Sequence, residues 1–117
     1  MNFEETQEQI LIRESVRKLC SAYPDDYWER HDGEGIYPQD FFDEVASAGW
    51  IGIAMPEKYG GAGKGIQEAA IVLEEVAASG AAMNGATPLH LSIFGMHPVV
   101  KHGSEAMREK YLPAVAR

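Results

Sequence analysis

A glycine-rich segment, residues 60–65, is the first place in this 117-residue sequence where residue types and spacing could do chemistry. Backbone amides in such a loop can hold a phosphate group when a helix follows. The spacing of a P-loop is absent, however, because Lys64 is followed by Gly65 and not by serine or threonine. We therefore interpret the glycines as a sharp turn against a helix, not as a nucleotide site.

The histidines and the cysteine do not form a metal-binding pattern. A zinc site needs three or four converging ligands, and the sequence has neither an HExxH motif nor a cysteine pair. Cys20 is the only cysteine, so no intrachain disulfide can form, and its helical spacing from Val16 predicts packing in a core. We predict no metal site, with the histidines solvated or packed: His31, His90, His97 and His102.

Acidic residues are numerous enough to suggest acid–base pairs, of which Glu74 and Glu75 are an example. Adjacent positions on a helix point in different directions, so we predict that these two form a solvated helix flank. No serine or cysteine stands in the context of a nucleophile beside its base. The sequence therefore predicts no catalytic residue in this chain.

The net charge is -8, and the acidic excess lies in residues 1–44, which hold 12 acidic and 4 basic residues. Such a surface repels phosphate chains, which argues against a nucleic-acid partner. No apolar run approaches the ~20 residues of a membrane span, and the acidic N-terminus is unlike a signal peptide. We therefore expect a cytoplasmic protein without a membrane span.

Helical periodicity and helix-ending residues predict about five helices. Thr6 and Gln9 form a capping box at the start of the first, which ends at Pro24. The other four run from Pro38 to Gly49, from Ile66 to Gly80, from Thr87–Pro88 to Gly95, and from Ser104 onward with a kink at Pro113. Residues 25–37 are expected to be a loop, residues 50–56 a buried connector or very short strand, and Pro98 a break before residues 99–102. Because no segment alternates with period 2 and the loops are short, we predict an all-α bundle of antiparallel helices.

Three segments form a pattern that extends over nearly the whole chain. The most specific is Gly49–Gly63, which reads GWIGIAMPEKYGGAG. Gly103–Glu105 and Lys110–Pro113 follow it, and residues 8–17 precede it. Together these segments resemble the N-terminal domain of the acyl-CoA dehydrogenases, in family order.

The resemblance implies an oxidoreductase that removes hydrogens from Cα and Cβ of an acyl-CoA, in fatty acid or amino acid catabolism. It also implies FAD as cofactor and an electron-transfer flavoprotein as acceptor. Family members have a helical N-terminal domain, a β-barrel middle domain and a helical C-terminal domain that carries the base, and we expect a homotetramer. Residues 1–117 are therefore expected to be the first domain of a larger enzyme, inactive alone and without bound FAD.

The helix before a Gly-x-x-Pro motif lines the acyl pocket in this family, and here that motif is Gly95–Pro98. Side chains four residues apart can face one way on a helix, and an acyl pocket should be mostly apolar with a few polar groups. The alternative is ordinary core packing of an apolar helix. The wall positions that the resemblance implies are Ala86, Leu89, His90, Leu91 and Phe94.

Met96–Pro98 and Gly103–Glu105 most resemble the glutaryl-CoA dehydrogenase branch. That branch places Arg and Ser for a distal carboxylate where this chain has Gly85 and Leu89, so a dicarboxylic substrate is not expected. Phe94 would shorten a straight channel, which favours a short, branched or aromatic acyl group.

Two other functions stay open at this point. Related flavoproteins act as oxidases or monooxygenases on nitroalkanes or aromatic compounds with the same fold. Alternatively, a free-standing helical module could bind a partner protein through the surface that a middle domain otherwise covers. We also expect exposed apolar surface to promote self-association, given the 45% apolar content.

Overall fold

The computed structural model describes residues 1–117 as helices and turns, which confirms the all-α prediction. Each of the five expected helices is present, and α2 and the short α6 are additional. None of the helices is long and apolar enough to cross a membrane. The elements are α1 (Gln7–Cys20), α2 (Asp25–Glu34), α3 (Gln39–Ser47), the 3₁₀ turn η1 (Glu57–Tyr59), α4 (Ile66–Val76), the π turn η2 (Ala77–Ala81), α5 (Ala82–Ile93), α6 (His97–His102) and α7 (Glu105–Val115).

The start of α1 is the predicted capping box. The Thr6 hydroxyl accepts from the Gln9 amide at 3.2 Å, and the Gln9 side chain accepts from the Thr6 amide at 3.0 Å. These two bonds satisfy amides that the first turn of a helix otherwise leaves unpaired. Val16 and Cys20 are buried on the inner side of α1, so the packing role predicted for the cysteine is confirmed.

The loop predicted for residues 25–37 is wrong over most of its length, because α2 occupies Asp25–Glu34. Only Trp28 and His31 of this helix are buried, so its apolar period is too sparse to detect in the sequence. Asp25 and Asp26 lie in the first turn, where carboxylates interact favourably with the helix dipole. Gly35 ends the helix in the left-handed conformation, with φ at 64°.

The start of the fourth expected helix also differs, since α5 begins at Ala82 and continues through Pro88. A proline inside a helix removes one backbone hydrogen bond and costs about 3 kcal/mol. Burial of Leu89 and Ile93 in the core offsets that cost, which local sequence cannot reveal. The π turn before α5 contains Gly80 at φ 94°, so this glycine ends the preceding helix as predicted.

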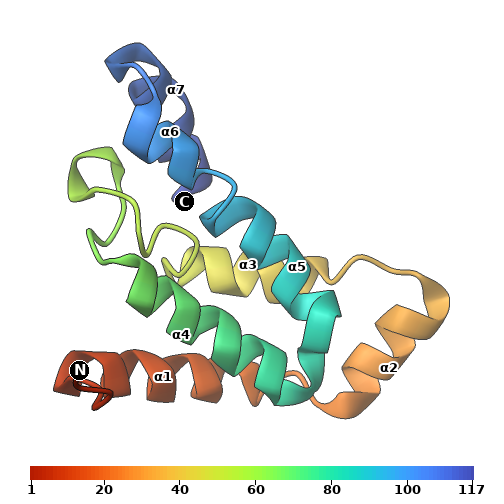
Figure 1. Cartoon of the computed structure of the whole chain (residues 1–117). Coiled ribbons are helices and arrows are strands. Elements are labelled where there is room, and N and C mark those ends of the chain that lie inside the picture. The colour runs from red at the N-terminus through yellow and green to blue at the C-terminus, as the bar shows by residue number, and fades with distance from the viewer.

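Two pairs of packed helices, α1 with α4 and α4 with α5, form the centre of the fold (Figure 1). Helix α1 lies along α4 in the same direction, because Gln9 bonds Glu68 near both helix starts and Arg17 bonds Glu75 further along both. Helix α5 then runs back against α4 after the η2 turn. The antiparallel arrangement predicted from short loops therefore holds for α4 and α5 but not for α1 and α4.

The segment between α3 and α4 is a buried connector without a strand. Ile51 and Ile53 are buried in the main core. Further along, Met55 and Tyr59 pack with Leu112 and Ala116 in a second, smaller core against α7. This connector therefore joins the α6–α7 unit to the rest of the fold.

Candidate functional site

Helix α5 carries four of the five predicted wall residues, Phe94 is its C-cap, and the five side chains lie in different directions. Leu89 is completely buried in the main core, and Ala86 is nearly buried. His90 and Leu91 are exposed, and Phe94 is half-buried against the core. Only part of the predicted set is therefore accessible to a ligand in this chain.

A groove of about 400 Å³ runs between α4 and α5 and contains two of the predicted residues, Ala86 and His90. Phe94 adjoins its end, because the rings of His90 and Phe94 stack with centroids 5.4 Å apart and planes 25° apart. Leu91 lies on another side of α5, and Leu89 lies beneath it. The other residues that line the groove are Leu73, Glu74, Ala77, Met83 and Thr87.

These five additional lining residues were not predicted, for two reasons. Met83 and Thr87 are close to Ala86 on a helical surface, but the helix was expected to start only at Thr87–Pro88 and the family resemblance implies neither position. Leu73 belongs to α4 and Ala77 to the η2 turn that follows it, and sequence spacing does not say which element packs beside α5. The spacing of Met83 from Ala86 could have predicted its place in the groove, but only if Pro88 is allowed inside a helix that starts at Ala82.

A second groove, of about 630 Å³, lies on the other side of α5, where Leu91 faces the segment between α2 and α3. Tyr37 and Pro38 line this side. His31 also lines it, with Nδ1 held 2.7 Å from the Tyr27 carbonyl oxygen. This groove is more polar than the first and does not include Ala86 or His90.

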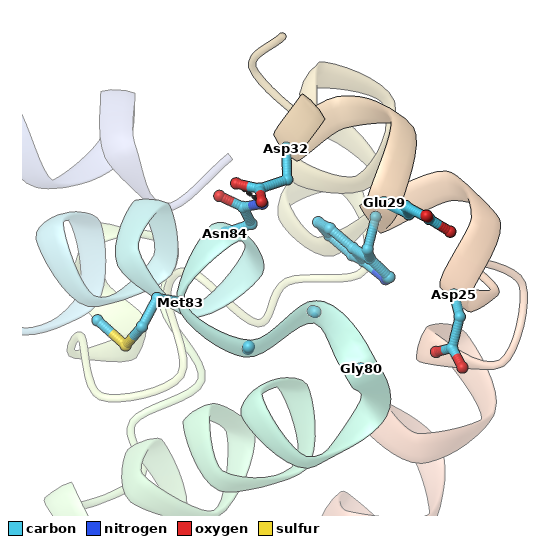
Figure 2. Close-up of a pocket in the computed structure, with 9 residues that line it drawn as sticks. Asp25, Glu29, Asp32, Gly80, Met83 and Asn84 are labelled. Carbon is cyan, nitrogen blue, oxygen red and sulfur yellow. Dashed lines mark hydrogen bonds between the residues drawn. The ribbon is translucent and has the colours of Figure 1, made fainter. Parts of the chain in front are cut away.

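The turn between α4 and α5 forms a third hollow, drawn in Figure 2, with acidic side chains from α2 at its edge. Asn84 points toward Asp32 and donates to its Oδ1 at 3.2 Å, while Met83 points away from the acids. Asp25 and Glu29 complete the acidic edge. No group of three or more His, Cys, Asp or Glu side chains in the structure is placed to hold a metal ion.

The glycine-rich loop has no amides to offer a phosphate group, because every amide from Gly60 to Gly65 already donates within the chain. Gly61 packs so closely on Met55 that an added Cβ would lie 2.1 Å from the Met55 carbonyl oxygen. The loop is therefore the sharp turn that its spacing indicated. The amides of Gly60, Gly61, Ala62, Gly63, Lys64 and Gly65 donate to Glu57, Pro56, Gly52, Met55, Ile53 and the Glu68 side chain, in that order.

Comparison with known proteins identifies the family to which this helical fold belongs. The family described as "Acyl-CoA dehydrogenase, N-terminal domain" matches residues 6–117. The chain belongs to this family. The resemblance carried by Gly49–Gly63 and the later segments is thereby confirmed.

Relatives of this acyl-CoA dehydrogenase N-terminal domain are much longer than the chain. The acryloyl-CoA reductase (NADH) of Anaerotignum propionicum is 27% identical over 100% of this chain and 29% of its own length. The glutaryl-CoA dehydrogenase of Desulfococcus multivorans is 28% identical over 99% of this chain and 30% of its own length. A solved structure described as the electron transferring flavoprotein of Acidaminococcus fermentans contains a similar chain, with a TM-score of 0.88 and 26% sequence identity. The match covers 99% of this chain and 30% of that chain.

In this acyl-CoA dehydrogenase N-terminal domain, the buried ionisable residues Glu75 and Cys20 have structural roles. Glu75 is buried, which corrects the prediction of a solvated flank; Glu74 beside it is exposed as predicted. Hydrogen bonds from Arg17 and then Arg13 hold the pKa of Glu75 below its ordinary value, although burial opposes them. Burial raises the pKa of the Cys20 thiol, which disfavours the reactive thiolate.

Proposed function

We propose that this chain is the helical N-terminal domain of an FAD-dependent acyl-CoA dehydrogenase, which oxidises the Cα–Cβ bond of an acyl-CoA thioester. The observation that carries the proposal is the groove between α4 and α5, on the helix that the family resemblance assigns to the acyl pocket. Four of its seven lining residues are hydrophobic, as an acyl tail requires. The family match over residues 6–117 supports it.

In this proposal the predicted wall residues have different tasks. Ala86 and His90 contact the acyl group directly, and Phe94 limits the length of the pocket through its stack on His90. Leu89 anchors α5 in the core beneath them. Leu91 forms the outer edge of the helix, 67% exposed here, against polypeptide that follows in the full-length enzyme.

The cofactor and the base belong, in this proposal, to polypeptide outside these residues. FAD, when bound, would accept the hydride from the substrate. The residues present do not fit its pyrophosphate, because the amides of the glycine loop are already used and the hollow beside α2 is acidic. The electron-transfer flavoprotein partner, the homotetramer and the cytoplasmic location stay predictions of the same proposal.

The test compares the full-length protein that contains this chain with residues 1–117 alone. With FAD, a panel of acyl-CoA thioesters and an artificial electron acceptor, we expect turnover by the full-length protein and none by residues 1–117. Turnover by residues 1–117 would contradict the assignment of base and flavin to other polypeptide. A full-length protein that retains FAD and oxidises no acyl-CoA would contradict the dehydrogenase proposal itself.

The similarity to an acryloyl-CoA reductase favours one second candidate, reduction of an enoyl-CoA at the same carbon pair. The acyl wall on α5 serves either direction, because substrate and product differ only at Cα and Cβ. Assays of the full-length protein with NADH and a 2-enoyl-CoA distinguish the two. Faster NADH consumption than acyl-CoA oxidation under matched conditions would favour the reductase.

A further inference from the structure

Ala86 and His90 on α5 and its C-cap Phe94 lie one above the other, each about one helical turn from the next. The rings of His90 and Phe94 form an offset stack, with centroids 5.4 Å apart and planes 25° apart. His90 is exposed and lines the groove, so its imidazole ring is accessible from the open space. The three residues therefore offer the groove an accessible aromatic side chain.

The groove beside the His90 ring includes Ala86, a small residue one turn before His90. The groove volume is about 400 Å³, whereas a protein cavity of about 150 Å³ can hold benzene. Leu73 of α4 and Ala77 of η2 line the groove across from α5, and Met83 lines it as well. Thioether sulfur at the edge of an aromatic ring is a favourable contact.

A negatively charged tail is poorly suited to this space. Glu74 is at the rim, and no lysine or arginine lines the groove. Gly85, where the glutaryl-CoA branch has Arg, is buried so tightly that an added Cβ would lie 2.6 Å from Cβ of Ala81 and 3.1 Å from Trp28. Straight aliphatic tails fit the volume but gain nothing from an exposed ring face.

We infer that the acyl group taken by this groove ends in an aromatic ring, which stacks on the free face of His90 above Ala86 and continues the Phe94–His90 stack. The inference rests on the proposed function and names the substrate class of the same site. It makes His90 a determinant of specificity and Ala86 the residue whose size admits the ring.

The experiment titrates the 117-residue chain with two neutral N-acetylcysteamine thioesters, so that the chain's net charge of -8 does not repel the phosphates of coenzyme A. The probes are the 3-phenylpropanoyl and 3-cyclohexylpropanoyl thioesters, which differ in aromaticity and little in size. NMR chemical shifts of α4, α5 and the His90 ring report the site of binding. We expect the phenyl probe to bind about twofold to tenfold more tightly, equivalent to about 0.4–1.4 kcal/mol.

Variants identify the residues responsible. His90→Ala should abolish the preference for the phenyl probe, and His90→Phe should retain it because a ring face remains. Ala86→Leu should weaken both probes by filling the space. His102 is another exposed histidine, at the end of α6 and away from the groove. His102→Ala is therefore the matched control and should leave both affinities unchanged. Circular dichroism confirms that each variant is folded.

Two outcomes would overturn the inference in distinguishable ways. Equal affinities for the two probes, with shifts at α4 and α5, would remove the aromatic specificity and leave the proposed acyl wall intact. Absence of shifts in the groove with either probe would contradict both the ring site and the proposed wall. Unchanged preference in His90→Ala would show that another surface selects the ring.

Discussion

Nη1 of Arg13 on α1 lies 2.6 Å from Oε1 of Glu75 on α4, and both side chains are largely shielded from water. Arg17, one turn further along α1, donates to the same carboxylate through Nε at 3.0 Å and Nη2 at 2.9 Å. Three charge-assisted hydrogen bonds therefore join the two parallel helices through one buried glutamate. Helix α4 in turn forms one side of the groove, so this ion pair positions the side that faces the proposed acyl wall of α5.

Substitution of Glu75 by alanine should destabilise the chain by about 1–3 kcal/mol, because Arg13 and Arg17 lose the carboxylate that satisfies them. Glu74→Ala is the matched control. That side chain is 66% exposed and has one bond to Arg13, so we expect a loss of less than about 0.5 kcal/mol. Urea unfolding measures both. Equal losses for the two variants would contradict the structural role given to Glu75.

Stability should fall at acidic pH. The hydrogen bonds from Arg17 and Arg13 lower the folded-state pKa of Glu75 below its ordinary value of 4.5. The pKa of Glu68 is lowered in the same direction, mainly by the bond from Gln9. Stabilisation by groups with lowered pKa is present above the ordinary value and is lost as pH falls through the folded-state value.

The measurement is the free energy of unfolding at a series of pH values from neutral to about pH 3, for the natural chain and for Glu75→Gln. The variant should show the smaller decline, so the difference between the two should narrow as pH falls. A difference that stays constant over this range would mean that Glu75 does not contribute through its ionisation.

Ala82, the first residue of α5 after the η2 turn, has φ 44° and ψ -134°, a conformation that residues with a Cβ rarely adopt. Glycine adopts it without strain, so Ala82→Gly should stabilise the chain by about 1 kcal/mol. Ala70→Gly, at an exposed position within α4, should instead destabilise it by about 1 kcal/mol. Thermal unfolding of the two variants should therefore shift in opposite directions.

Gly61 should not tolerate a larger residue. An added Cβ would lie 2.1 Å from the carbonyl oxygen of Met55, so Gly61→Ala must displace backbone in the connector. We expect a loss of at least about 2 kcal/mol and loosening of the α6–α7 unit, visible as faster amide hydrogen exchange in α7. Gly33→Ala is the control, because nothing lies within 4 Å of its added Cβ and alanine favours helix α2.

The exposed apolar side chains around α5 should cause weak self-association. Met83 is 71% exposed and Leu91 is 67% exposed. Both lie beside grooves where no other element covers them, and contiguous apolar surface of this kind favours association in water. Light scattering should show a mass that rises with concentration, and Leu91→Ser should reduce the rise. A concentration-independent monomer would contradict this prediction.

The amino-acid sequence by itself determined the helical class and several helix ends. The capping box of Thr6 and Gln9 and the stop at Gly80 depend on interactions within a few residues, which local spacing reveals. The same holds for the rejection of a phosphate loop, because Lys64 stands at the wrong position relative to its glycines. The i, i+4 spacing of Ala86, His90 and Phe94 also indicated a shared helical surface.

Only the tertiary structure decided where α5 begins, that α2 is a helix, and that Glu75 is buried. Each of these depends on a partner distant in sequence: the core beneath Leu89, the aromatic cluster around Trp28, and the arginines of α1. Helical periodicity reports which face of a segment is apolar but not which element covers it. The groove therefore could not be found from sequence, since it exists only where α4 and α5 pack side by side.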